Sequence, residues 1–407
     1  MARKNRLVVM DGLYHVTARV AHQERLLRDP AFKKLIVDWI YDIADFSGVD
    51  VCAWNIMDNH LHIFVHVPPV PEKYWLDKPE RNPDGSVLRE GTVPQSPAFS
   101  MRPHENRNPR WTPDLDDPVC VITPAGDSPS REAIQTALAE GLPVAHVPQA
   151  PTGFTMSDEE MLERLGHLYK PETVEKIADR WSAARENGRD DVVESEKDAF
   201  CRRMYNISQY MKTLKQRITQ VYNETYRHEG QLWDGRFFST LVDRDDALAR
   251  LLVTSYIELN SYRTKKKIPP KAWRWCSYAA ATGSSFGGDP SRGRQADAAV
   301  GSPLARKARE GYEKMFGEPW EEVVRRLESV FAAELPAEYD AEANNTGCIR
   351  TMAQLVKVSC RQFERGGFVS RDKDFAERTL AELPAKFPTV GTQSIKFFGR
   401  FGWEFAA

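Results

Sequence analysis

The chain has 407 residues, of which 41% are hydrophobic and 28% charged, and its formal net charge is −2. This length predicts two or three domains, and the composition excludes a wholly disordered chain, a collagen and a bundle of membrane helices. No segment approaches the roughly 18 to 20 consecutive apolar residues of a membrane span, and charged residues interrupt the N-terminal segment, so we expect a cytoplasmic protein without a secretory signal. The 6 cysteines form no C-x-x-C pair, which argues against a zinc ribbon or a disulfide framework.

The small net charge hides two segments of opposite sign. Residues 68–196 carry 14 basic and 24 acidic residues, a net charge of −10, whereas residues 199–275 carry 15 basic and 7 acidic residues, a net charge of +8. Both segments can be ordinary solvated surfaces, but the second is also the kind of basic segment that faces phosphates.

The first predicted elements are three strands and one helix. Residues 13–20 and 49–57 are short runs rich in β-branched and aromatic side chains, and residues 61–67 alternate with a period of two. Between the first two strands, residues 30–48 predict an amphipathic helix that ends at Gly48. Its apolar stripe consists of Phe32, Leu35, Ile36, Trp39, Ile40 and Ile43.

Prolines set the next region apart. Sixteen of the 26 prolines lie within residues 68–151, which excludes long helices there and predicts an insertion or a long ordered loop. The region ends in two predicted helices. Ser157 and Glu160 form a capping box at the start of one, and Pro171 lies in the first turn of the other.

A second set of elements follows this insertion. We predict a long helix at residues 200–230, a fourth strand at residues 237–243 and another helix at residues 245–263. The resulting order, β-α-β-β-α-β with a terminal helix, predicts an α+β fold of the ferredoxin-like, split β-α-β type with a large insertion after the third strand.

The rest of the chain is predicted to be mainly helical. A Gly/Ser-rich linker at residues 282–294 precedes a C-terminal domain at residues 295–407. Its helical segments are 303–317, 319–335 and 360–383, the last with a turn at Gly366 and Gly367.

Two histidines stand at the start of the third strand. His60 and His62 are two residues apart, so a strand projects both imidazoles from one face, where they can bind one metal ion. A histidine pair in a strand can also be structural. His66 lies four residues further, roughly 13 Å away at the rise of a strand, and we predict that it lies outside any such site.

Five motifs, in this order along the chain, resemble one family. They are YHVTARV, AWNIMDNHLHIFVHVP, YMKTLKQRITQVYN, GQLWDGRFFSTLVD and SYIELNSYR. The chain resembles the single-tyrosine HUH transposases, in particular the REP-associated tyrosine transposases, over residues 7–67 and 199–265. The resemblance implies a discontinuous catalytic domain at residues 1–67 and 197–275, interrupted by the acidic, proline-rich insertion at residues 68–196.

The resemblance also implies an activity. Members of this family cleave and rejoin single-stranded DNA at hairpins through a 5′-phosphotyrosine, and Tyr256 matches the nucleophile. A divalent metal, Mg²⁺ or Mn²⁺, would be held by His60, His62 and an amide that matches Asn260. Because Tyr256 and Asn260 are four residues apart, a helix would place them on one face. Tyr262 is a weaker candidate because it falls on another face.

The basic segment would then contact single-stranded or hairpin DNA, with salt-sensitive binding. The predicted DNA-binding residues are Lys212, Lys215, Arg217, Trp233, Arg236, Arg263, Lys265, Lys266 and Lys267. Trp233 can stack on a base or be a buried core residue. A homodimer is possible, because the family contains dimers as well as monomers.

Other functions stay open. Tyr256 can be an ordinary core aromatic, and the chain can be a host-adopted, catalytically silent protein that binds hairpin DNA. Ser261 and Tyr262 depart from the family, which commonly has a proline and a small apolar residue there, so the end of this helix can differ. A replication or conjugation nickase is disfavoured, because such proteins usually order their motifs differently.

Overall fold

The computed structural model describes residues 9, 11–82, 85–94, 152–264, 267–283 and 301–334, and the backbone of three short C-terminal strands. The chain divides into two compact units. The first comprises Met1–Pro69, Ser157–Arg189 and Arg203–Ala407, and the second comprises Val70–Met156 and Asp190–Arg202. The predicted domain boundaries remain a prediction.

An antiparallel sheet forms the centre of the first unit. Its strands are β1 (Gly12–Arg19), β2 (Asp50–Ile56), β3 (His60–Val67) and β6 (Phe238–Val242), in the spatial order β2-β3-β1-β6. Within this group of four, neighbouring strands are antiparallel. The strands β1 and β2 follow each other in the chain, with a helix between them, but β3 lies between them in the sheet. The α+β class is confirmed, and this strand order is compatible with the predicted split β-α-β arrangement.

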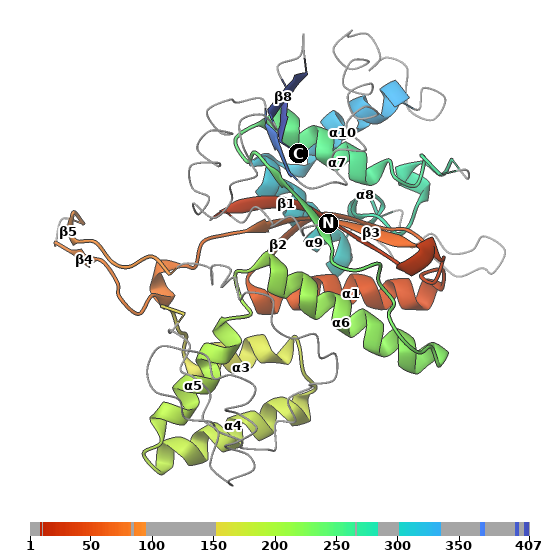
Figure 1. Cartoon of the computed structure of the whole chain (residues 1–407). Coiled ribbons are helices and arrows are strands. Elements are labelled where there is room, and N and C mark those ends of the chain that lie inside the picture. The colour runs from red at the N-terminus through yellow and green to blue at the C-terminus, as the bar shows by residue number, and fades with distance from the viewer. Residues whose placement is uncertain are drawn as a thin grey trace. The chain divides into compact units, whose positions relative to one another are not determined.

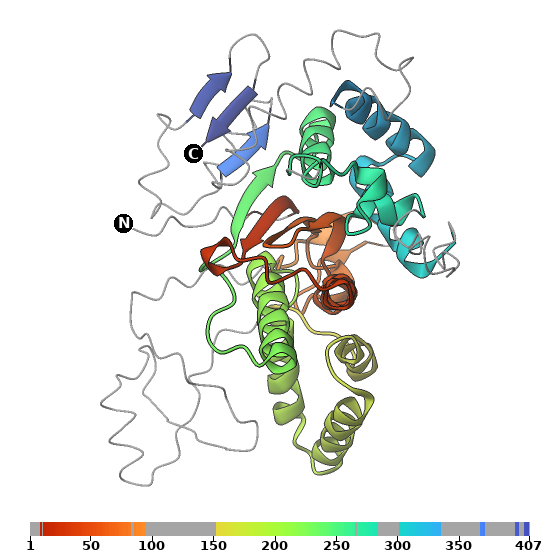
Figure 2. The same cartoon turned by 90° about the vertical axis from the view of Figure 1, so that its right-hand side faces the viewer.

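Helices cover the two faces of this sheet (Figures 1 and 2). One face carries α1 (Pro30–Ser47) and α6 (Ile207–Tyr226), and the other carries α7 (Ala247–Glu258). The helices α8 (Ser277–Ala281) and α9 (Pro303–Phe316) lie along the outer edge of β2. Trp54 of β2 marks the first face, since its Nε1 donates to the Tyr41 hydroxyl of α1 at 3.0 Å. The sheet is therefore buried on both sides, and polar side chains between it and α7 must find partners there.

Local sequence explains how α1 begins and ends. The Asp29 side chain accepts a hydrogen bond from the Ala31 amide at the N-cap, and Gly48 ends the helix with a φ of 68°. Phe32, Ile36, Ile40 and Ile43 of the predicted stripe are buried, whereas Leu35 is exposed. The buried face of α1 is displaced from the predicted stripe, because it also contains Val37, Tyr41 and Ala44.

The two helices predicted after Ser157 are present. They are α3 (Asp158–Gly166) and α4 (Pro171–Glu186). The Ser157 side chain accepts from the Glu160 amide at 3.1 Å, and Pro171 is the first residue of α4. Residues 95–151 of the predicted proline-rich region lie outside the described residues.

The helix predicted at residues 200–230 is wrong as one continuous element. It is divided into α5 (Asp190–Cys201), which belongs to the second unit, and α6. The cause is Asn206, whose side chain accepts from the amides of Ser208 and Gln209 and so begins a new helix. The second unit also contains η2 (Glu72–Tyr74) and the hairpin of β4 (Glu80–Arg81) and β5 (Val87–Arg89).

The C-terminal part contains strands as well as helices. The helix α9 and the following α10 (Trp320–Glu334) match the prediction, and the short η1 (Ala21–Gln23) and η3 (Pro270–Ala272) complete the helical elements described. The three strands β7 (Gly367–Ser370), β8 (Ile395–Phe398) and β9 (Trp403–Ala406) extend the sheet beyond β6 in the order β7-β9-β8. The helix predicted across 367–370 is therefore wrong, and most of the predicted linker at 282–294 lies outside the described residues. Among the described helices, none is both long and apolar enough to span a membrane.

Replacing Asn206 with alanine is expected to lower the free energy of unfolding by about 1 kcal/mol, because the first turn of α6 loses its side-chain acceptor. Chemical denaturation of the wild type and the variant measures this difference. Gln209→Ala is the control, because it keeps the backbone amide of Gln209, which donates to the same Asn206 side-chain oxygen. An equal loss in both variants would contradict the role of the Asn206 side chain.

Candidate active site

The two predicted histidines lie at the start of β3 and face α7. The β1 residues directly opposite them are Arg19 for His60 and Thr17 for His62. His62 is fully buried and His60 is half-buried. Their rings meet edge to face with centroids 4.9 Å apart, so the period of the strand brings both imidazoles to one place as predicted.

Asn260 joins the two histidines. His60 Nε2 lies 3.3 Å from Asn260 Oδ1, and Asn260 Nδ2 lies 3.0 Å from His62 Nε2. The helix α7 ends at Glu258, and Asn260 lies in the turn that follows it. The prediction that a helix extends to residue 263 and carries Tyr256 and Asn260 on one face is therefore wrong, although both residues reach the histidine pair.

The other ring nitrogens of the histidines are held by polar neighbours. Asn59 donates through Nδ2 to the Gln23 carbonyl at 3.4 Å, so its Oδ1 faces His60 Nδ1 at 2.7 Å and accepts a hydrogen bond from it. His62 Nδ1 lies 2.9 Å from His15 Nε2 and 3.1 Å from Thr17 Oγ1. Both histidines are thus oriented with Nε2 toward Asn260.

Burial keeps His62 neutral. Desolvation lowers the pKa of His62 well below its ordinary value, and the neighbouring His60 and His15 lower it further. A neutral imidazole carries the lone pair that a metal ion requires. His62 is therefore in the protonation state of a ligand at neutral pH.

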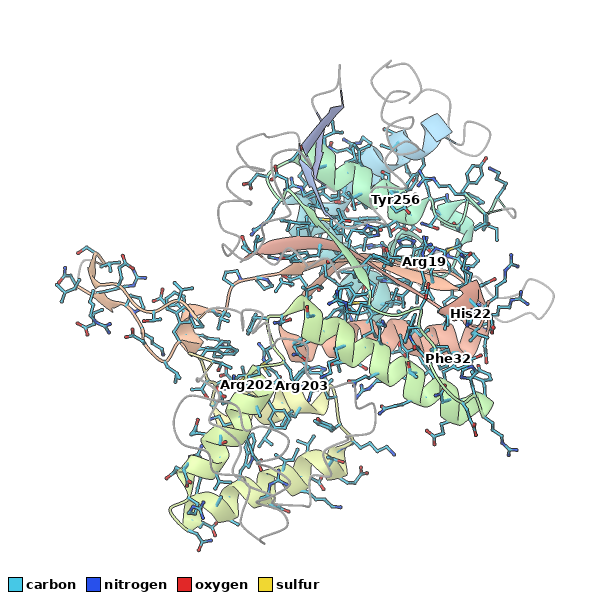
Figure 3. The ribbon with its side chains drawn as sticks, in the orientation of Figure 1. Arg19, His22, Phe32, Arg202, Arg203 and Tyr256 are labelled. Atoms are coloured by element: carbon cyan, nitrogen blue, oxygen red, sulfur yellow. The ribbon has the colours of Figure 1, made fainter. Side chains whose placement is uncertain are left out.

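Tyr256 lies against the same histidines. Its ring centroid is 5.6 Å from those of His62 and His15, with the ring edge-on to both, and the Arg263 guanidinium lies 5.0 Å from its centre. The side chain is 2% exposed. Figure 3 shows Tyr256 on α7, which crosses over the sheet. A potential nucleophile, three imidazoles, an amide and a guanidinium thus share one site.

The chain matches a family model over residues 8–72, whose description is "Transposase IS200 like". This match confirms the resemblance to the single-tyrosine transposases. The matched segment contains the histidine pair and the first three strands of the sheet. No curated protein and no solved structure matches the chain.

The family match supports a transposase that acts on DNA, and members of this family generally use a divalent metal ion. Among the described residues, no three His, Cys, Asp or Glu side chains are grouped as a metal site requires. The candidate ligands of this transposase-like site are instead two imidazoles and one amide. Because His60 Nδ1 donates to Asn59, its Nε2 and Asn260 Oδ1 are both acceptors at 3.3 Å. Imidazole nitrogens and an amide oxygen are donor types that suit a divalent ion, and His62 Nε2 would exchange its 3.0 Å contact with Asn260 Nδ2 for that ion.

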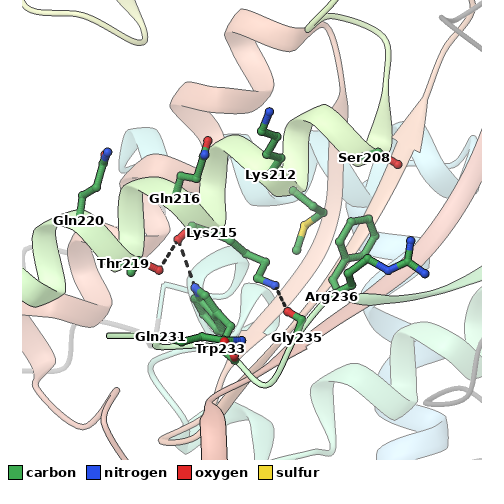
Figure 4. A pocket seen from close by; sticks show the side chains of 12 residues that line it. Ser208, Lys212, Lys215, Gln216, Thr219, Gln220, Gln231, Trp233, Gly235 and Arg236 are labelled. Atoms are coloured by element: carbon green, nitrogen blue, oxygen red, sulfur yellow. Dashed lines mark hydrogen bonds between the residues drawn. The ribbon is translucent and has the colours of Figure 1, made fainter. Parts of the chain in front are cut away.

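Four of the predicted DNA-binding residues line a groove of about 480 Å³ between α6 and the loop before β6. They are Lys212, Lys215, Trp233 and Arg236. Figure 4 shows Lys212, Gln216 and Gln220 along one side of α6, and Lys215 and Thr219 on the side toward Trp233. The twelve lining residues include three cations and no carboxylate, which suits a phosphate backbone.

Trp233 forms part of the wall of this groove. It is 5% exposed, its Nε1 donates to the Lys215 carbonyl at 3.1 Å, and its backbone pairs with Val20 at the end of β1. The Lys215 ammonium donates to the Gly235 carbonyl at 2.6 Å. These contacts favour a fixed wall over a ring that moves to stack on a base.

The remaining predicted DNA-binding residues do not join this groove. Arg217 lies on another side of α6 and donates to the Leu168 carbonyl, and burial lowers its pKa. Arg263 packs on Tyr256, and Lys267 Nζ lies 5.0 Å from the ring centre of Tyr262. Lys265 and Lys266 lie outside the described residues.

Sequence reasoning missed four polar residues around the histidines. They are His15, Thr17, Asn55 and Asn59. His15 and Thr17 are two residues apart on β1, the strand that pairs with the histidine strand, so the alternation of that strand already carried a signal. His66 was correctly placed outside the site, since it lies between the carboxylates of Asp11 and Asp50.

Proposed function

We propose that the chain is a tyrosine HUH endonuclease and transposase of the REP-associated type, which cleaves and rejoins single-stranded DNA at hairpin or repeat ends. The observation that carries this proposal is the meeting of Tyr256, His60, His62 and Asn260 at one place. These residues come from segments about 200 positions apart, and each matches a role in the family that the chain resembles.

Each residue has a task in this reaction. The Tyr256 oxygen attacks the scissile phosphate, so that an O–P bond forms to the tyrosine and the bond to the 3′ oxygen breaks, leaving a 5′-phosphotyrosine and a 3′-OH. His60, His62 and Asn260 would hold Mg²⁺ or Mn²⁺, which when bound neutralises charge on the phosphate and orients it. Arg263 places a positive charge beside the tyrosine ring, where the attacking oxygen becomes anionic.

Single-stranded or hairpin DNA would follow the groove on α6. Lys212, Lys215 and Arg236 supply the positive charge there, and Trp233 supplies an apolar wall. The catalytic domain would comprise residues 1–67 and 197–275, with residues 68–196 as an acidic insertion and residues 295–407 as a separate C-terminal domain. A cytoplasmic location and a possible homodimer belong to this proposal.

A covalent adduct tests the proposal. The wild type, incubated with 3′-end-labelled single-stranded hairpin DNA and Mn²⁺, is expected to retain the label on the protein in a denaturing gel, and a chelator is expected to remove this signal. Recovery of the labelled adduct after Mn²⁺ or Mg²⁺ is added back identifies which ion the reaction requires. Adduct formation that is indifferent to the chelator and to His62→Ala would reject the metal site.

The second candidate is a catalytically silent protein that binds hairpin DNA. The burial of Tyr256 favours it, because a nucleophile that is 2% exposed must become accessible before it can reach a phosphate. The same experiment separates the two candidates. Tight hairpin binding by the wild type without any adduct, at several metal concentrations, would favour the silent binder.

A further inference from the structure

A buried carboxyl group anchors the helix that carries Tyr256. Glu258 stands two residues after Tyr256 on α7 and is fully buried. Its Oε1 accepts hydrogen bonds from Ser277 Oγ and from the Tyr312 hydroxyl, both at 2.6 Å, and its Oε2 accepts from the Tyr278 amide at 3.2 Å. The carboxyl group therefore ties α7 to α8 and α9.

The same helix is also tied to the strand next to the histidines. Asn55 on β2 lies directly opposite His62 on β3, and its Nδ2 donates to the Ile257 carbonyl at 2.8 Å. Its Oδ1 accepts from Trp273 Nε1 at 2.9 Å. Both the Nδ2 and the Oδ1 of Asn55 are therefore hydrogen-bonded, and Nδ2 fixes the backbone of Ile257, the residue after Tyr256.

Ser277 joins the two anchors. Its hydroxyl accepts from the Trp54 amide at 2.9 Å and lies 2.9 Å from the Tyr312 hydroxyl. Polar groups buried in this way are costly unless they are bonded, so α7 has little freedom to shift against β2 while the network is intact. A shift of about 1 Å in a reacting group can cost roughly 100-fold in rate.

We propose that Glu258 and Asn55 are positioning residues that hold Tyr256 against His62 of the same chain, so that each chain completes its own active site. This inference rests on the proposed function. It assigns a task to η3, α8 and α9, which lie outside the segment matched by the family model. These elements form a support behind the tyrosine helix.

Single-residue variants test the positioning role. Tyr312→Phe and Asn55→Ala are expected to slow adduct formation roughly 10- to 100-fold, while hairpin affinity changes less than about twofold. Tyr41→Phe is the matched control, because it removes a buried hydroxyl bonded to Trp54 on the opposite face of β2. A parallel loss of rate and affinity, or an equal loss of rate in Tyr41→Phe, would overturn the positioning role.

Mixing two inactive variants tests whether the site belongs to one chain. Tyr256→Phe keeps the histidines and His62→Ala keeps the tyrosine, so a mixture regains adduct formation only if a tyrosine serves the histidines of another chain. We expect no recovery after co-refolding or co-expression. Recovery would overturn this inference and leave the proposed function intact, whereas a wild type without adduct would overturn both.

Discussion

Tyr256→Phe is expected to lower covalent adduct formation at least about 1,000-fold and to leave hairpin binding unchanged, because it removes the attacking oxygen and keeps the ring. The ring makes the packing contacts with His15, His62 and Arg263, and phenylalanine preserves them. The measurement is the initial rate of label transfer to protein, with hairpin affinity determined by fluorescence anisotropy on the same preparations.

The matched control for this experiment is Tyr262→Phe. Tyr262 follows α7, lies beside Lys267 and is the other tyrosine of the same motif. We expect its variant to form the adduct at the rate of the wild type. If the Tyr256→Phe variant still forms the adduct and the Tyr262→Phe variant does not, the nucleophile has been assigned to the wrong tyrosine.

The histidine pair was the part of the site that local sequence could predict. A strand has a period of two, so His60 and His62 had to share a face once the strand was recognised. The first three strands and α1 were also predicted from local signals. These are the alternation of side chains along the strands, the proline at the start of the helix and Gly48 at its end.

The meeting of Tyr256 and Asn260 was predicted by the family resemblance, but with incorrect geometry. Spacing of four residues suggested one helical face, whereas α7 ends at Glu258 and Asn260 lies in the turn beyond. The helix ends where Asn55 Nδ2 donates hydrogen bonds to the carbonyls of Ile257 and Glu258, at 2.8 and 3.4 Å. That partner lies about 200 residues earlier in the chain, so no local pattern could reveal it.

Charge content predicted a basic region better than it predicted individual contacts. Lys212 and Lys215 face the groove, but Arg217 turns to the Leu168 carbonyl because successive helical residues point in different directions. The role of Glu258 could not be predicted from the sequence either. Its hydrogen-bond partner Tyr312 lies 54 residues away, and no local pattern connects the two.

Gly311→Ala is expected to lower the free energy of unfolding by about 3 kcal/mol, because α9 packs on β2 through this glycine. A β-carbon added at Gly311 would lie far inside van der Waals contact with the Val51 carbonyl oxygen, and within 3.3 Å of the Cys52 α-carbon. Backbone atoms of a central sheet cannot move aside as a flexible side chain can, so α9 must shift away from β2. Chemical denaturation measures the loss.

The control for this substitution is Gly166→Ala at the end of α3, where an added β-carbon meets nothing within 4 Å. It is expected to be neutral or to stabilise the chain by about 0.5 to 1 kcal/mol, since alanine favours a helix over glycine. Gly311 directly precedes Tyr312, so a shift of α9 should also weaken the hydroxyl contact with Glu258 and slow adduct formation. A Gly311→Ala variant with wild-type stability and wild-type adduct rate would contradict both the close packing of α9 on β2 and its support of the tyrosine helix.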